Sequence, residues 1–101
     1  MEQRPASFDW DDGNRAKCQK HGLSIGEIEA FLSGTPRIAP DRKHSQAERR
    51  YLAVGRDSHG RAMFVAFTMR EQTDRLLIRP ISARYMHRKE IENYEKESSK
   101  V

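Results

Sequence analysis

The sequence predicts an α+β domain, in which two N-terminal helices and one C-terminal helix pack on an antiparallel sheet of about four strands. Apolar residues recur at helical spacing in the first third of the chain. They then alternate with a period of two between Arg37 and Arg84, and helical spacing returns near the C-terminus. We expect residues 1–101 to form a single domain, with ragged termini at about 1–6 and 98–101.

The first third of the chain carries the signals of a short strand and two helices. Two aromatic residues flank an aspartate, as on the edge of a sheet. Aspartates that can cap a helix follow, and a serine and a glutamate three positions apart then form a capping box. The expected elements are the strand Phe8–Trp10, a helix from Asp11 or Asp12 to about His21 with Gly22 as its stop, and a helix opened by Ser24 and Glu27 that ends at Gly34.

The remainder is predicted to be a meander of antiparallel strands followed by a helix. Alternating side chains indicate the strands, and polar or glycine-containing segments indicate the turns. The most apolar strand suits the middle of the sheet. The expected segments are the strand Arg37–Ala39, a basic loop at Asp41–Gln46, the strand Arg49–Arg56, a turn at Asp57–Gly60, the apolar strand Ala62–Met69, a turn at Glu71–Asp74, the strand Arg75–Arg84 and a helix at Met86–Lys96.

The last predicted strand carries cations that a purely structural strand does not need. Charged side chains are rarely buried without partners, so Arg79 and Arg84 indicate an anion, either an internal carboxylate or a phosphate. Regular alternation would place the two arginines on opposite faces. Pro80 suggests that the strand lies at an edge of the sheet or contains a bulge there, and a bulge would turn the two arginines towards one face. Alternatively, Arg79 pairs with Glu48 or Asp74, and Arg84 orients the final helix.

The net charge of +4 is concentrated in one segment. Between Arg37 and Arg61 there are seven basic residues against three acidic ones, so the rest of the chain is balanced. Such an excess favours a polyanion such as RNA, although a solvated basic surface has the same composition. One cysteine, no signal peptide and no stretch near the roughly 18 apolar residues of a membrane span lead us to expect a cytoplasmic protein without membrane contact.

No metal or cofactor is expected. The four histidines are scattered, and none lies at ligand spacing from Cys18 or from another histidine. No glycine-rich phosphate loop is present. The remaining chemistry is the cleavage of RNA without a metal ion, in which the 2′-hydroxyl is the nucleophile. The protein then supplies a base, an acid and cations, and the planar fork of arginine suits phosphate oxygens.

Short motifs follow one another in a specific order over residues 8–94. They are Phe8–Asp9–Trp10–Asp11, Lys20–His21–Gly22, Asp41–Arg42 with His44–Ser45, Glu48–Arg49, Val54–Gly55–Arg56, Thr68, Arg79–Pro80–Ile81–Ser82–Ala83–Arg84, and Glu90 with Tyr94. In this order and spacing the chain resembles the BrnT family of bacterial type II toxins, which share a fold like that of the RelE ribonuclease toxins. At Tyr85–Met86 it departs from relatives, which tend to continue with a second basic residue and an alanine.

The resemblance implies a metal-independent endoribonuclease that needs no cofactor and halts translation. It also implies a cognate BrnA-type antitoxin, bound in a hetero-oligomer, whose ribbon-helix-helix domain alone contacts operator DNA. The positions that match the family's polar signature are Lys20, His21, Glu48, Arg49, Arg79, Ser82 and Arg84. The basic segment adds the candidate RNA-binding residues Arg42, Lys43, Arg50 and Arg56.

Two hypotheses about function follow. In the first, the chain cleaves RNA: Glu48 or His21 accepts the 2′-hydroxyl proton, and Lys20 orients the backbone or protonates the leaving 5′-oxygen. Arginines neutralise the phosphate, and the candidates are Arg49, Arg79 and Arg84. In the second, which the departure at Tyr85–Met86 motivates, the chain is a non-catalytic module, a decayed toxin that still binds an antitoxin or RNA.

Overall fold

The computed structural model describes residues 7–44 and 48–98. The predicted ragged end at 1–6, residues 99–101 of the one predicted at 98–101, and residues 45–46 of the predicted basic loop lie outside these ranges. The elements in chain order are β1 (Ser7–Phe8), α1 (Asp12–Gln19), α2 (Ile25–Ser33), β2 (Arg37–Pro40), the 3₁₀ helix η1 (Arg42–His44), β3 (Tyr51–Arg56), β4 (Ala62–Gln72), β5 (Arg75–Tyr85) and α3 (Arg88–Ser98).

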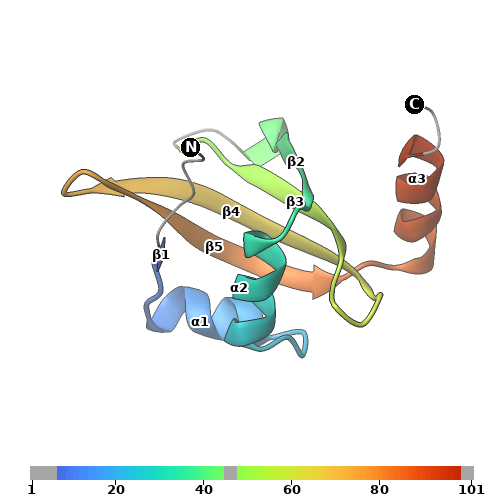
Figure 1. The fold of residues 1–101 in the computed structure, drawn as a ribbon, viewed down its shortest axis with the longest axis horizontal. Helices are drawn as coiled ribbons and strands as arrows, with labels where there is room; N and C mark the ends of the chain where they lie inside the picture. Colours follow the sequence, from blue (N-terminus) through green and yellow to red (C-terminus); the bar gives the residue numbers. More distant parts are fainter. Residues whose placement is uncertain (1–6, 45–47, 99–101) are drawn as a thin grey trace.

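The described strands form one sheet in the order β1-β5-β4-β3-β2 (Figure 1). Strands β2 to β5 are antiparallel, and β4 is the middle strand, both as predicted. However, β1 pairs with β5 in parallel, so the sheet is five-stranded and mixed rather than four-stranded and antiparallel. The α+β class is confirmed. The sequence pattern missed the parallel pair because a two-residue strand has no periodicity, and its partners Leu77 and Ile78 are distant in the chain.

Both N-terminal helices begin at the predicted caps. The Asp11 carboxylate accepts a hydrogen bond from the Asn14 backbone N–H (3.0 Å), and the Asn14 side chain accepts one from the Asp11 N–H (2.7 Å). The capping box of Ser24 and Glu27 opens α2 as expected. Helix α1 ends at Gln19, earlier than predicted, and the chain then turns at Gly22 with a φ of 93°.

Other element boundaries differ from the predicted ones by two or three residues. Strand β4 continues to Gln72 because only Thr73 and Asp74 form the turn, with φ values of 45° and 65°. Positive φ at both positions is typical of the two-residue turn that follows the twist of a hairpin. Strand β3 starts at Tyr51, and α3 starts at Arg88.

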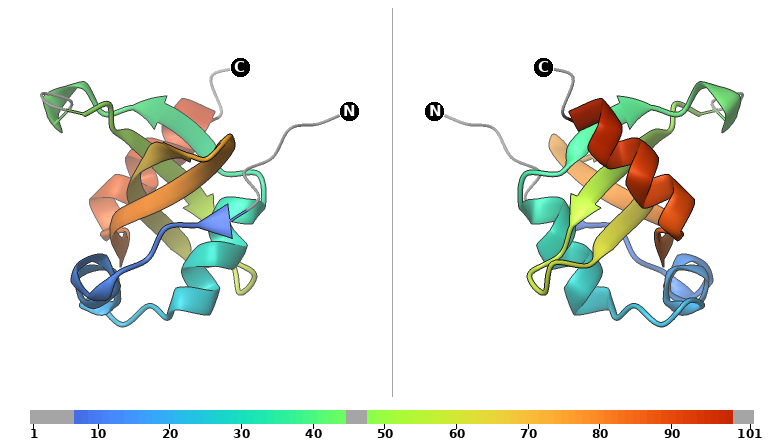
Figure 2. Two further views of the ribbon diagram at one scale, coloured as in Figure 1. Left: turned by 90° about the vertical axis from the view of Figure 1, so that its left-hand side faces the viewer. Right: turned by 90° about the vertical axis from the view of Figure 1, so that its right-hand side faces the viewer.

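The two faces of the sheet are covered differently, with α1 and α2 on one side and α3 on the other (Figure 2). The hydrophobic core lies under α1 and α2, where Met63 and Val65 of β4 and Ile28 of α2 are fully buried. By contrast, none of the described side chains of α3 is fully buried. None of the helices in the described ranges is long and apolar enough to cross a membrane.

A β-bulge interrupts β5 beside Pro80, as the proline predicted. Ser82 lies opposite Ala66 and Pro80 lies opposite Phe67, so Ile81 is the extra residue. The bulge therefore brings Arg79 and Arg84 onto the same face, opposite Thr68 and Phe64 of β4. Because those two partners are four residues apart on one strand, the arginines are separated by about 13 Å along the sheet.

Candidate functional site

A pocket of about 280 Å³ opens beside the bulge, between α1 and the sheet. Four charged side chains line it, and they come from α1, from the segment before β3 and from β5. Three are cations and one is a carboxylate: Lys17, Arg50, Arg79 and Glu48. The rest of the lining consists of Gly13, Asn14, Thr68, Pro80 and Ile81.

The buried side chain of Asn14 holds α1 against the bulge. Its Nδ2 donates to the carbonyl oxygens of Asp9 and Pro80, both at 2.9 Å, and only 6% of the residue is exposed. Strand β1 pairs only with Leu77 and Ile78, so β5 is open beside Pro80 and accepts this contact. One amide thus fixes the start of α1, the end of β1 and the irregular part of β5 relative to one another.

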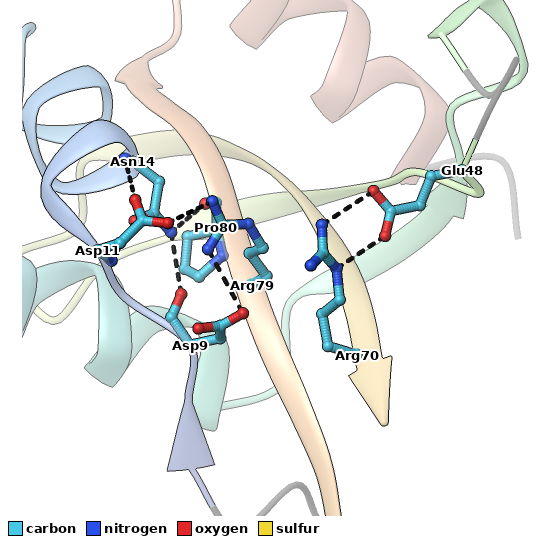
Figure 3. A network of polar contacts seen from close by, with 7 residues as sticks. All are labelled: Asp9, Asp11, Asn14, Glu48, Arg70, Arg79 and Pro80. Atoms are coloured by element: carbon cyan, nitrogen blue, oxygen red, sulfur yellow. Dashed lines mark hydrogen bonds and ion pairs between the residues drawn. The ribbon is translucent and has the colours of Figure 1, made fainter. Parts of the chain in front are cut away.

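The anion that Arg79 meets is a pair of carboxylates from the β1–α1 connection (Figure 3). Its Nη2 donates to Asp11 Oδ2 at 2.8 Å, and its Nη1 donates to Asp9 Oδ2 at 3.4 Å. The hydrogen bond with Asp11 raises the pKa of Arg79, and the pKa of Asp11 is lowered by the Asn14 backbone N–H and by Arg79. The expected partners Glu48 and Asp74 are therefore wrong, because the acids come from a segment about 70 residues away.

Glu48 has a different arginine as its partner, which the sequence did not single out. Arg70 Nε donates to Glu48 Oε2 at 2.8 Å, and Arg70 Nη2 approaches Oε1 at 3.4 Å (Figure 3). Both side chains are more than 40% exposed, so solvent screens this pair. The buried Thr68 hydroxyl donates to the carbonyl oxygen of Arg49 at 2.7 Å. That bond fixes the backbone between Glu48 and Arg50, the two residues that face the pocket.

Sequence reasoning also missed Lys17, whose side chain lines the pocket. A cation near the end of α1 already suits the helix dipole, which is a sufficient structural reason for Lys17. The available signal was its spacing of four from Gly13 and three from Asn14, which places all three on one side of the helix.

Arg84 contacts α3 and does not line the pocket. Its Nη1 and Nη2 donate to the two oxygens of Glu90 at 2.7 and 2.8 Å, and its guanidinium lies 4.8 Å from the centre of the Phe64 ring. Glu90 also accepts the backbone N–H of His87 at 2.9 Å. The alternative in which Arg84 orients the final helix is therefore confirmed. The hydrogen bonds from Arg84, followed by the one from His87, lower the pKa of Glu90 to about 2.

We expect the contribution of the Glu90 carboxylate to the free energy of unfolding to depend on pH. Its folded-state pKa of about 2 is below the ordinary value of 4.5. The contribution is therefore fully present above about pH 5 and is lost as the pH falls towards 2. Urea unfolding of the wild type and of Glu90→Gln measures it: the difference in unfolding free energy should be largest near pH 6 and should shrink near pH 2.5. The exposed Glu92→Gln is the control, and a pH-independent difference for Glu90→Gln would contradict the assignment.

The other predicted residues lie outside the lining of this pocket. Lys20 and His21 are exposed just after α1, and Arg42 and Lys43 are exposed on η1. Arg56 is paired with Glu95 and bonded to the Gly60 carbonyl. Ser82, Arg49 and Arg84 also do not line the pocket. Of the predicted site residues, the structure thus brings together Glu48, Arg50 and Arg79.

Two further groups bear on possible chemistry. Cys18 is fully buried, and burial raises the pKa of its thiol to about 11, so it is an inert core thiol. Among the described residues, no three histidine, cysteine or acidic side chains lie close enough together to hold a metal ion.

Comparison with known proteins gives one family. The family model described as the ribonuclease toxin BrnT of type II toxin–antitoxin systems matches residues 10–90. No curated protein matches the chain. The matched range contains every residue that lines the pocket beside the bulge.

Proposed function

This chain belongs to the BrnT family, the ribonuclease toxins of type II toxin–antitoxin systems, and from that membership we propose that it cleaves RNA without a metal ion. The proposed site is the pocket beside the bulge. The observation that carries this assignment is the meeting there of three cations and one carboxylate from distant parts of the chain. These are the groups that cleavage by a 2′-hydroxyl requires.

In the proposed mechanism the ribose supplies the nucleophile. The 2′-oxygen attacks the adjacent phosphorus while its proton passes to the Glu48 carboxylate. The bond from phosphorus to the 5′-oxygen breaks, and Lys17 gives the leaving oxygen a proton. The products are a 2′,3′-cyclic phosphate and a 5′-hydroxyl. Arg50 and Arg79 neutralise the charge that develops on the phosphate.

Arg79 is suited to this role because its two carboxylate partners leave part of its guanidinium available. Arginine has five N–H donors, and the contacts with Asp9 and Asp11 use two of them. The carboxylates hold the plane of the guanidinium in place, so that the remaining donors can bind phosphate oxygens without loss of further side-chain freedom.

The other family-matched positions have supporting roles in this proposal. Lys20 and His21 extend the basic surface beyond the end of α1, and Arg49 lies beside the proposed base in the chain. His21 is the alternative base, and Lys20 is the alternative acid. Ser82 and Arg84 continue the same sheet face towards α3, where Arg84 acts through its contact with Glu90. The exposed Arg42 and Lys43, and Arg56, bind parts of the RNA backbone that lie farther from the pocket.

The direct test incubates the purified chain with RNA in EDTA. We expect cleavage, with 2′,3′-cyclic phosphate ends, and a block of translation when the chain is expressed without its antitoxin. A strict requirement for magnesium would contradict the proposed mechanism, and 3′-hydroxyl ends would contradict the 2′-hydroxyl as nucleophile.

Replacing Lys17 with glutamine should weaken RNA binding in a salt-dependent way. The loss of one phosphate contact should make the negative slope of log Kobs against log salt concentration less steep by about 0.7 for single-stranded RNA. The binding of a short RNA at several salt concentrations measures this slope. Lys89→Gln on the exposed side of α3 is the matched control, and an equal change in both variants would show that only net charge matters.

One feature favours a second candidate, the non-catalytic module. The carboxylate and one of the cations of the pocket are already paired internally, Glu48 with Arg70 and Arg79 with Asp9 and Asp11. If these pairs do not open, the chain binds its antitoxin but does not cut RNA. Expression without antitoxin then leaves growth unaffected, whereas the ribonuclease stops it.

Family membership implies an antitoxin partner. We propose that it is a BrnA-type protein with a ribbon-helix-helix domain, and that the toxin reaches operator DNA only through it. We also propose that the arrangement of helices and strands is RelE-like. Sequencing of the neighbouring reading frame tests the first of these, because a frame without a ribbon-helix-helix pattern would contradict it.

A further inference from the structure

An apolar groove of about 480 Å³ lies between α3 and the sheet, and it shares no residue with the pocket beside the bulge. Its floor consists of Leu52 and Val54 of β3 and Phe64 of β4, all of which are only partly buried. Met86 and Tyr94 contribute to the wall on the side of α3, and β2 forms the opposite rim.

Helix α3 stands over this floor without filling the groove. The contacts that hold it are at its edges: Arg84 with Glu90, Arg56 with Glu95, and the Arg37 guanidinium over the Tyr94 ring at 5.6 Å. No described side chain of α3 is fully buried against the sheet. Apolar surface that remains open beneath a helix is typical of a binding surface rather than of a fully packed hydrophobic core.

The rim on the side of β2 offers both apolar and backbone contacts. β2 is the edge strand of the described sheet, and Ala39 lies on the face of the floor, opposite Leu52. Ile38 is 57% exposed and lies on the other face of the same edge, opposite Ala53. The Asp41 N–H donates to the Arg50 carbonyl of the neighbouring segment at 2.8 Å. Because backbone groups alternate along an antiparallel strand, the N–H and carbonyl of Ile38 point away from β3, towards the open edge. A strand edge that no other described strand covers, beside an exposed isoleucine, is a template for another chain.

Charge decides between the possible occupants. RNA is disfavoured, because the floor is apolar and the carboxylates of Glu90 and Glu97 lie on the helix wall. A second copy of this chain would bring together two molecules of net charge +4. The rim and the turn that follows it carry Arg37, Arg42 and Lys43, which favour a partner with carboxylates. In this proposal Arg42 and Lys43 contact RNA only in the chain without antitoxin.

We propose that this groove is the docking site of the antitoxin. An apolar stretch of the antitoxin, flanked by carboxylates, pairs with the open edge of β2, so that its side chains on one face enter the groove beside Ala39 and those on the other face cover Ile38. The groove lies on the sheet face that also carries Thr68 and Arg79, so an antitoxin that continues along this face covers the pocket beside the bulge. The inference rests on family membership and does not require that the chain cleaves RNA.

The test compares two exposed apolar residues at opposite ends of the sheet. Ile38→Asp changes the exposed apolar side chain on the edge of β2, and Leu76→Asp changes the other large exposed apolar residue of the described chain, at 46% exposure, away from that edge. The probe is the protein encoded next to this chain's gene, titrated against the full-length chain. We expect Ile38→Asp to weaken binding roughly 30-fold and Leu76→Asp to leave it unchanged. Ala39→Glu, also exposed on the rim, provides a second variant with the same expected loss.

Several results would overturn the docking site. One is unchanged antitoxin affinity of Ile38→Asp and Ala39→Glu when both variants unfold thermally like the wild type, and another is an equal loss of antitoxin affinity in Ile38→Asp and Leu76→Asp. A third is that Ile38→Asp weakens RNA binding in place of antitoxin binding. The last is that the chain alone forms a dimer that Ile38→Asp dissociates. RNA cleavage by the uncomplexed variants is measured in parallel and should be unchanged. Failure of the wild type to cut RNA would contradict the proposed function and leave the docking site standing.

Discussion

Glu48→Gln should reduce RNA cleavage by about 10²- to 10⁴-fold while the chain remains folded. Glutamine keeps the shape of the side chain but cannot accept the 2′-hydroxyl proton. The loss should fall on kcat more than on KM, because the carboxylate acts in the transition state. Glu48 pairs with Arg70 only at the exposed surface, so we expect the free energy of unfolding to change by less than about 1 kcal/mol.

The matched control is Glu71→Gln, an exposed acid on β4 next to the same arginine in the chain. It removes the same charge without reaching the pocket and should cleave RNA at the wild-type rate. Single-turnover cleavage of a short RNA, together with urea unfolding of both variants, separates the two effects. Full activity in Glu48→Gln would remove Glu48 as the base and leave His21 as the candidate.

Asn14→Ala should be the most destabilising change at the site, by about 3 kcal/mol. The substitution leaves the Asp9 and Pro80 carbonyls without their buried donor and breaks the capping box with Asp11. For a domain of this size the loss corresponds to a fall in Tm of roughly 12–24 °C. Cleavage at a temperature where the variant is folded should also fall, because the start of α1 is no longer fixed to the bulge.

Gln19→Ala on the same helix controls for the loss of a side-chain amide. Gln19 is exposed and makes one bond of 3.2 Å to the Arg15 carbonyl, so we expect a change within about 0.5 kcal/mol. Calorimetry measures both variants. A fall in Tm for Asn14→Ala no larger than for Gln19→Ala would show that the two carbonyls find other donors, and that Asn14 does not hold the site together.

Features set by neighbours in the chain could be predicted from the sequence. The cap at Ser24 was found because it and its partner Glu27 lie three residues apart, and Asp11 was one of two neighbouring aspartates predicted to cap the first helix. The bulge was found because proline has no N–H to donate within a sheet. The grouping of Glu48 with Arg79 followed from the family resemblance, and the pocket brings these two residues together.

Features that depend on distant segments could not be predicted in this way. The parallel pairing of β1 and the acids that hold Arg79 join residues about 70 positions apart, and Asp11 already had a sufficient local explanation as a cap. Lys17 was overlooked for the same reason, since its place near the helix end accounted for its charge. These contacts of the site were missed because each residue already had a sufficient explanation in its own part of the chain.

The extra residue at Ile81 makes the strand sensitive to length in a way that its composition does not reveal. If Ile81 were paired in a regular ladder, every side chain after it would point to the opposite face of the sheet, so this one unpaired residue decides which face each later side chain occupies. Deleting Ile81 would remove the bulge and leave Arg84 opposite Phe64, whereas inserting one residue into the regular part of β5 before Arg84 would turn Arg84 towards the core and release Glu90. The face on which Arg84 lies therefore depends on how many residues of β5 pair with β4.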